Sequence, residues 1–467
     1  MANQLIKKVG IYFIGNMATK VTMALMIPIY AFFVAPDALG MFDFIQALTL
    51  LVAPILYAAI WESLLRFILI EKDKGTVNKT VSTVTLFFFA VTFIIVLLTV
   101  ILIAVSDSWR VEIVCCALMI VFYSGAQIWQ YFARGLNQSK LYTKSGILSA
   151  LVNFSLILVL VCFFKMQFIG LTISYIVGQI CIFLVIEAKI KLISKLEISQ
   201  LDFMLLKDIV RFSLPLAANL LFLTAINSFG RIVVTANFGA ETNGFYTFAL
   251  RFGSIVSALG GIFSMAIIEE SILRIGQPNS VGFLSKVAEI TTKALFQLAS
   301  LVLPYVAIFF FIICDTEYYA AWAYSPLTML YGSLVVLSTV VGNVFQIEKK
   351  TEMAMLSTFF GAVVVIVGSL LSAYFQSFYG IVISLVLGAF VLLVARILLG
   401  RKLIAYSFPF GKAVAFLGLY SLQIGIYAFA FISECVPLLI VWAVVATAIY
   451  TPMLIKQYKE LSSIPDV

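Results

Sequence analysis

Three positively charged side chains, Lys20, Arg231 and Arg251, lie inside long apolar stretches of the sequence. A charge at the centre of a bilayer costs about 2.5–3.5 kcal/mol on insertion scales, so it is kept only where it faces a protein interior or an aqueous path. Cations in such a path attract anions. The three residues therefore predict a transporter whose polar path handles an anion.

Amide side chains accompany these cations at helical spacing. Asn16 lies four residues before Lys20, and Asn227 lies four residues before Arg231, so each pair shares one face of a helix. A polar face on an apolar helix must point away from lipid, either into a path or toward a neighbouring helix. The predicted substrate-binding residues are Lys20, Arg231, Arg251, Asn16, Asn227, Gln127 and Gln130.

Five further charged residues are candidates for gating or ion coupling. Glu62 and Arg66 are four residues apart, as are Glu270 and Arg274, and we expect each couple to form an ion pair at a cytoplasmic gate. Asp43 has two open roles, because it can pair with Lys20 or Arg251 or can titrate during transport. The sequence does not distinguish these roles.

The composition is that of an integral membrane protein. The chain has 467 residues, of which 63% are hydrophobic and only 11% are charged, whereas soluble proteins have about 25% charged residues. Histidine, the most frequent general base and metal ligand, is absent from the sequence. We find no nucleotide-binding glycine loop, metal-ligand motif or nucleophile motif. We therefore expect no catalytic residues, metal, cofactor or nucleic-acid partner.

Apolar stretches long enough to cross a bilayer recur along the whole chain. They predict an all-α protein with about fourteen transmembrane helices. The predicted spans are residues 9–34, 41–64, 80–106, 111–133, 142–164, 168–187, 208–236, 243–268, 288–314, 319–346, 353–374, 379–399, 410–432 and 435–455.

The basic residues alternate between the loops. Most of the 30 lysines and arginines fall in every second connection, starting from Lys7 and Lys8, and Arg396 is counted in the last such group with Arg401. Because positive loops remain in the cytoplasm, this pattern predicts cytoplasmic N- and C-termini.

Two short sequences recur in the second half of the chain. GMFDF at 40–44 returns as GFYTF at 244–248, and ESLLR at 62–66 returns as ESILR at 270–274. With six spans in each half, the halves share their orientation, which predicts a parallel repeat with the substrate site between the repeats. The predicted domains are a six-helix bundle at 1–200, a second one at 201–404, and a terminal helix pair with the tail at 405–467.

Three segments of the chain resemble bacterial lipid-linked oligosaccharide flippases. They are KKVGIYFIGNMATKVTMALMIPIYAFFVAPDALGMFDF at 7–44, YFARGLNQSKLYTKSGILSALVNFSLILVL at 131–160 and RFSLPLAANLLFLTAINSFGRIVVTANFGAETNGFYTFALRF at 211–252. The resemblance covers roughly residues 5–460. The family often has an acid directly before the arginine of the seventh span, whereas Gly230 precedes Arg231 here, which leaves Arg231 freer to meet a ligand.

The resemblance implies a flippase of the bacterial inner membrane that moves undecaprenyl diphosphate-linked repeat units for O-antigen or capsule synthesis. It implies membrane lipid, a polysaccharide polymerase and a chain-length regulator as partners, and basic residues in a central cavity. A cation-coupled multidrug antiporter of the same superfamily is the nearest alternative, although its usual substrates are cations. A membrane-embedded polymerase or acyltransferase and a purely structural scaffold are more remote.

Overall fold

All the elements that the structure describes are helices, which is how a chain satisfies its backbone polar groups inside a bilayer. The structure is a computed structural model, and it describes residues 22, 24–69, 74–273, 280–348 and 350–462. The chain folds into two compact units, Met1–Thr235 and Ala236–Val467.

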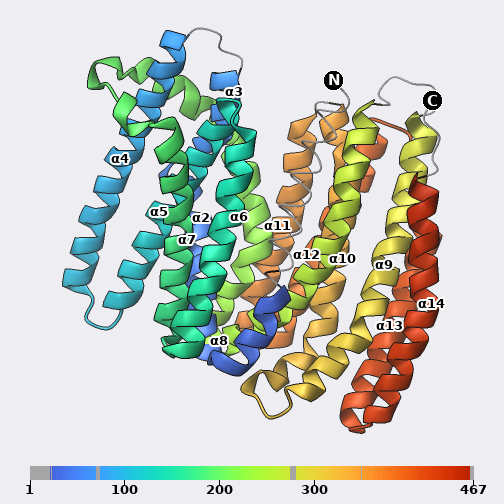
Figure 1. Cartoon of the computed structure of the whole chain (residues 1–467). Helices are drawn as coiled ribbons and strands as arrows, with labels where there is room; N and C mark the ends of the chain where they lie inside the picture. The colour runs from blue at the N-terminus through green and yellow to red at the C-terminus, as the bar shows by residue number, and fades with distance from the viewer. Residues whose placement is uncertain (1–21, 23, 70–73, 274–279, 349, 463–467) are drawn as a thin grey trace. The chain divides into compact units, whose positions relative to one another are not determined.

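In the first unit, α5 and α7 form a central layer. Each of them packs against α2, and α6 covers the other side of α7 (Figure 1). The core between them is aromatic and includes the fully buried Trp129, whose ring lies 4.4 Å from that of Phe183. The elements are α2 (Pro36–Leu56), α3 (Trp61–Leu69), α4 (Lys74–Val105), α5 (Arg110–Gly135), α6 (Ser139–Ile157), η1 (Leu158–Phe163), α7 (Gln167–Ile190), η2 (Ile193–Lys195), η3 (Ile198–Gln200) and the first part of α8 (Phe203–Leu273).

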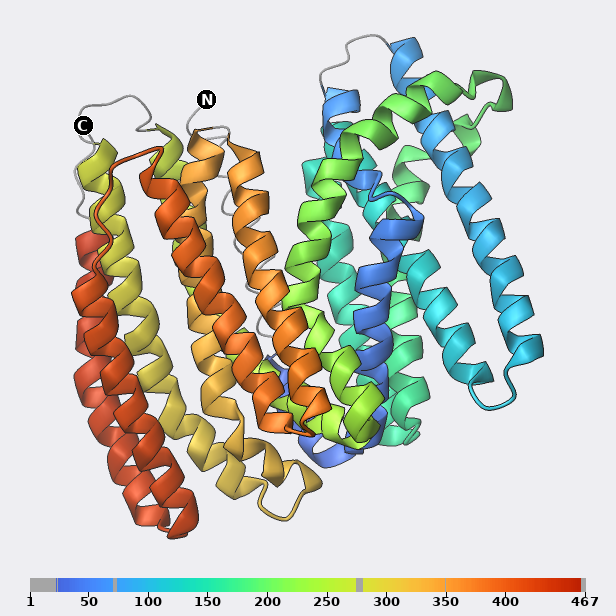
Figure 2. The same cartoon turned by 180° about the vertical axis from the view of Figure 1, so that it is seen from behind.

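In the second unit, α12 packs against α10 and α11, while α9 packs against α10, α13 and α14 (Figure 2). The elements after α8 are α9 (Ser280–Ile312), η4 (Glu317–Ala323), α10 (Ser325–Ile347), α11 (Thr351–Tyr374), α12 (Phe378–Arg401), α13 (Phe410–Ile432) and α14 (Val436–Ser462).

The predicted fold class is confirmed. In the described part of the chain, 12 helices are long and apolar enough to cross a membrane. One of them, at Phe203–Ala258, is 56 residues long and covers two predicted spans, and the shorter apolar helix Ala24–Phe33 falls in the first predicted span. Gly239 separates the two spans within α8, because its φ of 90° and ψ of 167° interrupt the helix.

The span expected at 41–64 is broken. It divides into α2 and α3, with a turn at 57–60 in which Ala58 and Ala59 have φ values of 50° and 41°. A left-handed backbone is unfavourable for alanine, so this turn needs outside support. The Ser213 hydroxyl of α8 supplies some of it by donating a 2.8 Å hydrogen bond to the Ala58 carbonyl oxygen.

The connection from α7 to α8 is tied to the first unit. Ser82 and Thr83 of α4 bond to the backbone of this connection, at Glu197 and Asp202 respectively. The Lys79 ammonium lies 2.7 Å from the Asp202 carboxylate and holds the pKa of Asp202 below its usual value. These contacts, together with the Ser213 bond, place the start of α8 with the compact unit Met1–Thr235. The predicted domain boundary at 200/201 stays a prediction.

The terminal helix pair is fastened to α9. Gln457 of α14 donates a 2.7 Å hydrogen bond to Gln297 of α9, and the hydroxyls of Tyr305 and Thr447 lie 2.6 Å apart. Gln423 of α13 donates to the Tyr450 hydroxyl of α14. Segment 405–467 therefore packs as part of the second unit, whereas its assignment as a separate domain stays a prediction from the repeat.

Candidate functional site

Arg231 is paired with a carboxylate from another helix. Its Nη1 lies 3.5 Å from Oδ1 of Asp43, which α2 contributes to the same unit. The Arg231 side chain is 20% exposed and that of Asp43 only 3%. With Gly230 directly before Arg231, the acid that pairs with it comes from a distant part of the chain.

The ion pair engages one nitrogen of the Arg231 guanidinium. Arginine has five N–H donors, and the buried Nε of Arg231 has no hydrogen-bond partner. Burying two opposite charges costs several kcal/mol per ion, and pairing offsets this cost only in part. The Asp43–Arg231 pair is thus costly to bury, and one contact of 3.5 Å compensates the guanidinium only in part.

Arg251 lies in the second unit on a rigid part of α8. Gly253 of α8 and Gly332 of α10 face each other so closely that a Cβ at Gly253 would overlap the Thr328 carbonyl oxygen. The Thr328 hydroxyl donates a 2.6 Å hydrogen bond to the Ala249 carbonyl oxygen across the same crossing. This close packing holds the segment of α8 that carries the half-buried Arg251 against α10.

The predicted amide residues that the structure describes lie on α8 and α5. Asn227 is exposed, and its Nδ2 donates 2.7 Å to the Leu223 carbonyl oxygen of its own helix. Gln127 and Gln130 are half-buried in α5, and Gln130 lies next to Gly146 of α6. A contact of these residues with substrate stays a prediction.

Several predicted residues fall outside what the structure describes. They are Lys20, Asn16, Arg274 and the side chain of Glu270. The Glu270–Arg274 ion pair and the cationic role of Lys20 therefore stay predictions.

The expected ion pair between Glu62 and Arg66 is not formed, although both side chains are described. Glu62 instead accepts a 2.9 Å hydrogen bond from the Tyr131 hydroxyl of α5. The Arg66 guanidinium lies 4.4 Å above the ring of Phe212 in α8. Glu62 and Arg66 thus contact a tyrosine and a phenylalanine of neighbouring helices instead of each other. Both residues join α3 to its surroundings, and their part in gating stays a prediction.

Arg396 is a buried cation, although the loop-charge pattern counts it in the last basic group with Arg401. It lies inside α12 with 9% of its surface exposed, and its Nη1 donates a 2.8 Å hydrogen bond to the Ser338 carbonyl oxygen of α10. A Cβ at Gly342 would lie 2.9 Å from the same Nη1, so the missing side chain of Gly342 makes room for the guanidinium. The only sequence signal was its place inside the predicted span 379–399.

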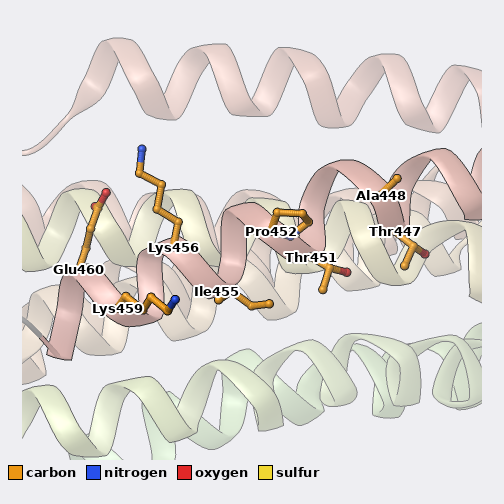
Figure 3. A pocket seen from close by; sticks show the side chains of 8 residues that line it. All are labelled: Thr447, Ala448, Thr451, Pro452, Ile455, Lys456, Lys459 and Glu460. Atoms are coloured by element: carbon orange, nitrogen blue, oxygen red, sulfur yellow. The ribbon is translucent and has the colours of Figure 1, made fainter.

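One open cavity of about 740 Å³ lies along α14, and its lining residues all belong to this helix. Figure 3 shows small and apolar side chains from Thr447 to Ile455, followed by Lys456, Lys459 and Glu460 at the far end. None of the predicted substrate residues lines it. In the part of the chain that the structure describes, we find no cluster of three or more histidine, cysteine, aspartate or glutamate residues that could hold a metal ion.

Comparison with protein families gives one match. The family model described as "Polysaccharide biosynthesis protein" matches residues 5–268, which is more than half of the chain. The chain belongs to this family. No curated protein sequence matches it.

Solved structures of two kinds of transporter have the same fold as this protein. The lipid II flippase MurJ in an inward closed conformation superposes with a TM-score of 0.70 and 12% identity, and the match covers 97% of this chain and 99% of MurJ. An inward-facing multidrug resistance MATE family transporter of the MOP superfamily gives 0.57 and 15% identity, with coverage of 85% and 99%. A MATE structure in complex with MaD3S gives 0.55 and 16% identity, with coverage of 88% and 96%. The protein is thus a multi-pass membrane protein with the fold of MOP-superfamily transporters.

Proposed function

We propose that this protein is a flippase for undecaprenyl diphosphate-linked oligosaccharide repeat units in the bacterial inner membrane, serving O-antigen or capsular polysaccharide synthesis. The family and the fold support polysaccharide biosynthesis and transport. The observation that carries the choice of an anionic substrate is Arg231, a partly exposed guanidinium inside an apolar helix whose nearest acid lies 3.5 Å away.

The diphosphate is the part of the substrate that these cations recognise. Arginine presents a planar fork that binds phosphate oxygens in pairs, whereas lysine acts as a compact point charge. Arg231, Arg251 and Lys20 offset the cost of bringing the diphosphate out of water, and the polyprenyl tail stays in the bilayer. Amides such as Asn227 and Gln127 receive the sugars.

Alternating access moves the head group from one side of the membrane to the other. An inside-negative membrane potential favours outward movement of negative charge by about 2.3 kcal/mol per charge per 100 mV. The potential therefore assists the reaction without a coupled ion. Asp43 and Glu62 are the residues through which a proton or sodium ion would couple.

The experiment uses a strain that lacks the native gene and carries plasmid copies of the variants. We expect lipid-linked repeat units to accumulate on the cytoplasmic leaflet of the deletion strain, and the wild-type gene to restore surface polysaccharide. Arg251→Ala restores little of it and Arg251→Lys an intermediate amount, because lysine keeps the charge but loses the fork. Normal surface polysaccharide from both variants would remove Arg251 from the substrate site.

A multidrug antiporter is the second candidate, because MATE transporters share the fold. The buried arginines argue against it, since a positive path repels cationic drugs. Drug resistance on overexpression, without any change of surface polysaccharide in the deletion strain, would reverse the order of the two candidates.

A further inference from the structure

The contact between Asp43 and Arg231 is loose and one-sided. One nitrogen of the guanidinium lies 3.5 Å from one carboxylate oxygen, beyond the 2.7–2.9 Å that is usual for a charge-assisted hydrogen bond. The Arg231 Nε has no hydrogen-bond partner. The carboxylate therefore balances the charge of Arg231 without occupying its fork.

The two side chains also differ in access. Arg231 is the more exposed partner, at 20% against 3% for Asp43, so a ligand reaches the guanidinium before the carboxylate. An anion that binds Arg231 must compete with the charge of Asp43. If the anion draws the guanidinium away from Asp43, the buried carboxylate loses part of the positive charge that stabilises it. This loss costs free energy.

We propose that Asp43 is a specificity-determining residue that restricts Arg231 to multiply charged head groups. Coulomb attraction scales with the charge of the ligand, so a diphosphate overcomes the competing carboxylate more readily than a phosphodiester with a single negative charge. The energy of the Asp43–Arg231 pair is a fixed cost for any anion that displaces the carboxylate, and a singly charged head group gains less from Arg231 to offset it. This inference rests on the proposed function, because it assumes that Arg231 binds the diphosphate.

The need for such selectivity follows from the surroundings of the protein. Singly charged phospholipids are abundant in membranes and are attracted to basic residues near the surface. An arginine without a competing acid would be occupied by them for much of the time. Asp43 keeps Arg231 available for the scarcer lipid diphosphate.

The test measures how a singly charged lipid competes with a lipid diphosphate. The full-length protein is placed in nanodiscs of phosphatidylcholine with increasing fractions of phosphatidylglycerol, and the dissociation constant of radiolabelled undecaprenyl diphosphate is measured. For the wild type we expect a change of about twofold or less. For Asp43→Asn we expect binding that is several-fold tighter in phosphatidylcholine alone and weakens about tenfold or more as phosphatidylglycerol is added.

Three variants interpret the result. Asp43→Glu keeps the charge and should retain the selectivity of the wild type. Asp202→Asn removes an exposed acid paired with Lys79 in the same unit, and it should also behave like the wild type. Thermal unfolding checks that each variant is folded, and Asp43→Ser replaces Asp43→Asn if the latter cannot be purified.

The outcomes separate this inference from the proposed function. Equal sensitivity to phosphatidylglycerol in wild type and Asp43→Asn would overturn the role of Asp43, as would loss of selectivity in Asp43→Glu. Arg231→Ala tests the function itself. If Arg231→Ala binds undecaprenyl diphosphate as tightly as the wild type in phosphatidylcholine, then Arg231 does not bind the diphosphate, whatever Asp43 does.

Discussion

Arg231 and Arg396 are both arginines inside membrane helices, but the protein compensates their charges differently. The buried Nε of each arginine has no hydrogen-bond partner. Arg231 is partly exposed and faces the carboxylate of Asp43. Arg396 is buried and donates to a backbone carbonyl oxygen, and no carboxylate lies within ion-pair distance of it in the described residues. The first arrangement can exchange one anion for another. The second fills a closed slot between two helices, so burial alone does not mark a substrate site.

The largest expected effect is on transport by the Arg231 site. Asp43→Asn combined with Arg231→Met removes both charges of the pair, so that neither of the two is left without the other. We expect the double variant to fold but to lose about tenfold or more of its transport, because the phosphate-binding fork is gone. Surface polysaccharide in the complemented deletion strain measures it. Wild-type amounts of polysaccharide would show that the pair is only structural.

The next largest effect is expected on stability, at the space beside Gly342 that the Arg396 guanidinium fills. Gly342→Ala places a Cβ 2.9 Å from Nη1 and 3.1 Å from Cζ of Arg396. We expect a loss of about 1–3 kcal/mol of unfolding free energy, as for other overpacked sites. In an Arg396→Ala background the same substitution should cost much less, because the guanidinium is gone. Thermal unfolding in detergent measures the cost of Gly342→Ala in both backgrounds. Additive effects would mean that residues 342 and 396 do not pack against each other.

Arg396→Met should have a smaller effect. Replacing a buried charge by an apolar side chain of similar volume is often neutral or stabilising, so we expect a stability change within about 1 kcal/mol and transport close to the wild type. Complementation and thermal unfolding measure the two quantities. A folded Arg396→Met protein without transport would place Arg396 in the substrate path and remove the distinction from Arg231.

The smallest effect is expected at an exposed ion pair. The hydrogen bond from Lys79 lowers the pKa of Asp202, so its contribution to stability is present above the pKa of an unfolded aspartate, about 3.9, and is lost as the pH falls through the lower pKa of the folded state. Asp202→Asn should lower the unfolding temperature slightly at neutral pH and leave it unchanged at strongly acid pH. An equal difference at all pH values would exclude the ion pair as its cause.

The fold was predictable because hydropathy and loop charge report on the bilayer directly. In the part of the chain that the structure describes, the predicted spans follow from apolar length, and the main departure is the break between α2 and α3. That break depends on Ala58 and Ala59, which have no turn-forming tendency of their own, and on Ser213 from a distant helix. A sequence pattern does not contain such long-range support.

The site was predictable in its residue types but not in its pairings. Arg231 and Asp43 were both recognised as candidates, but neither was assigned to the other, because their contact joins α2 to α8. Glu62 was given a partner one helical turn away, yet Tyr131 of α5 competes for it successfully. Arg396 resembled a loop residue because Arg401 and Lys402 follow it closely, and only Gly342 on another helix explains its burial.

The most direct test of the central claim is a flipping assay with purified protein in vesicles. Undecaprenyl diphosphate-linked oligosaccharide is placed in one leaflet, and its appearance in the other is followed with a reagent that cannot cross the membrane. The account predicts movement by the wild type and little movement by the Asp43→Asn, Arg231→Met double variant. Equal movement by both proteins, or export of a cationic dye without movement of the lipid, would contradict it.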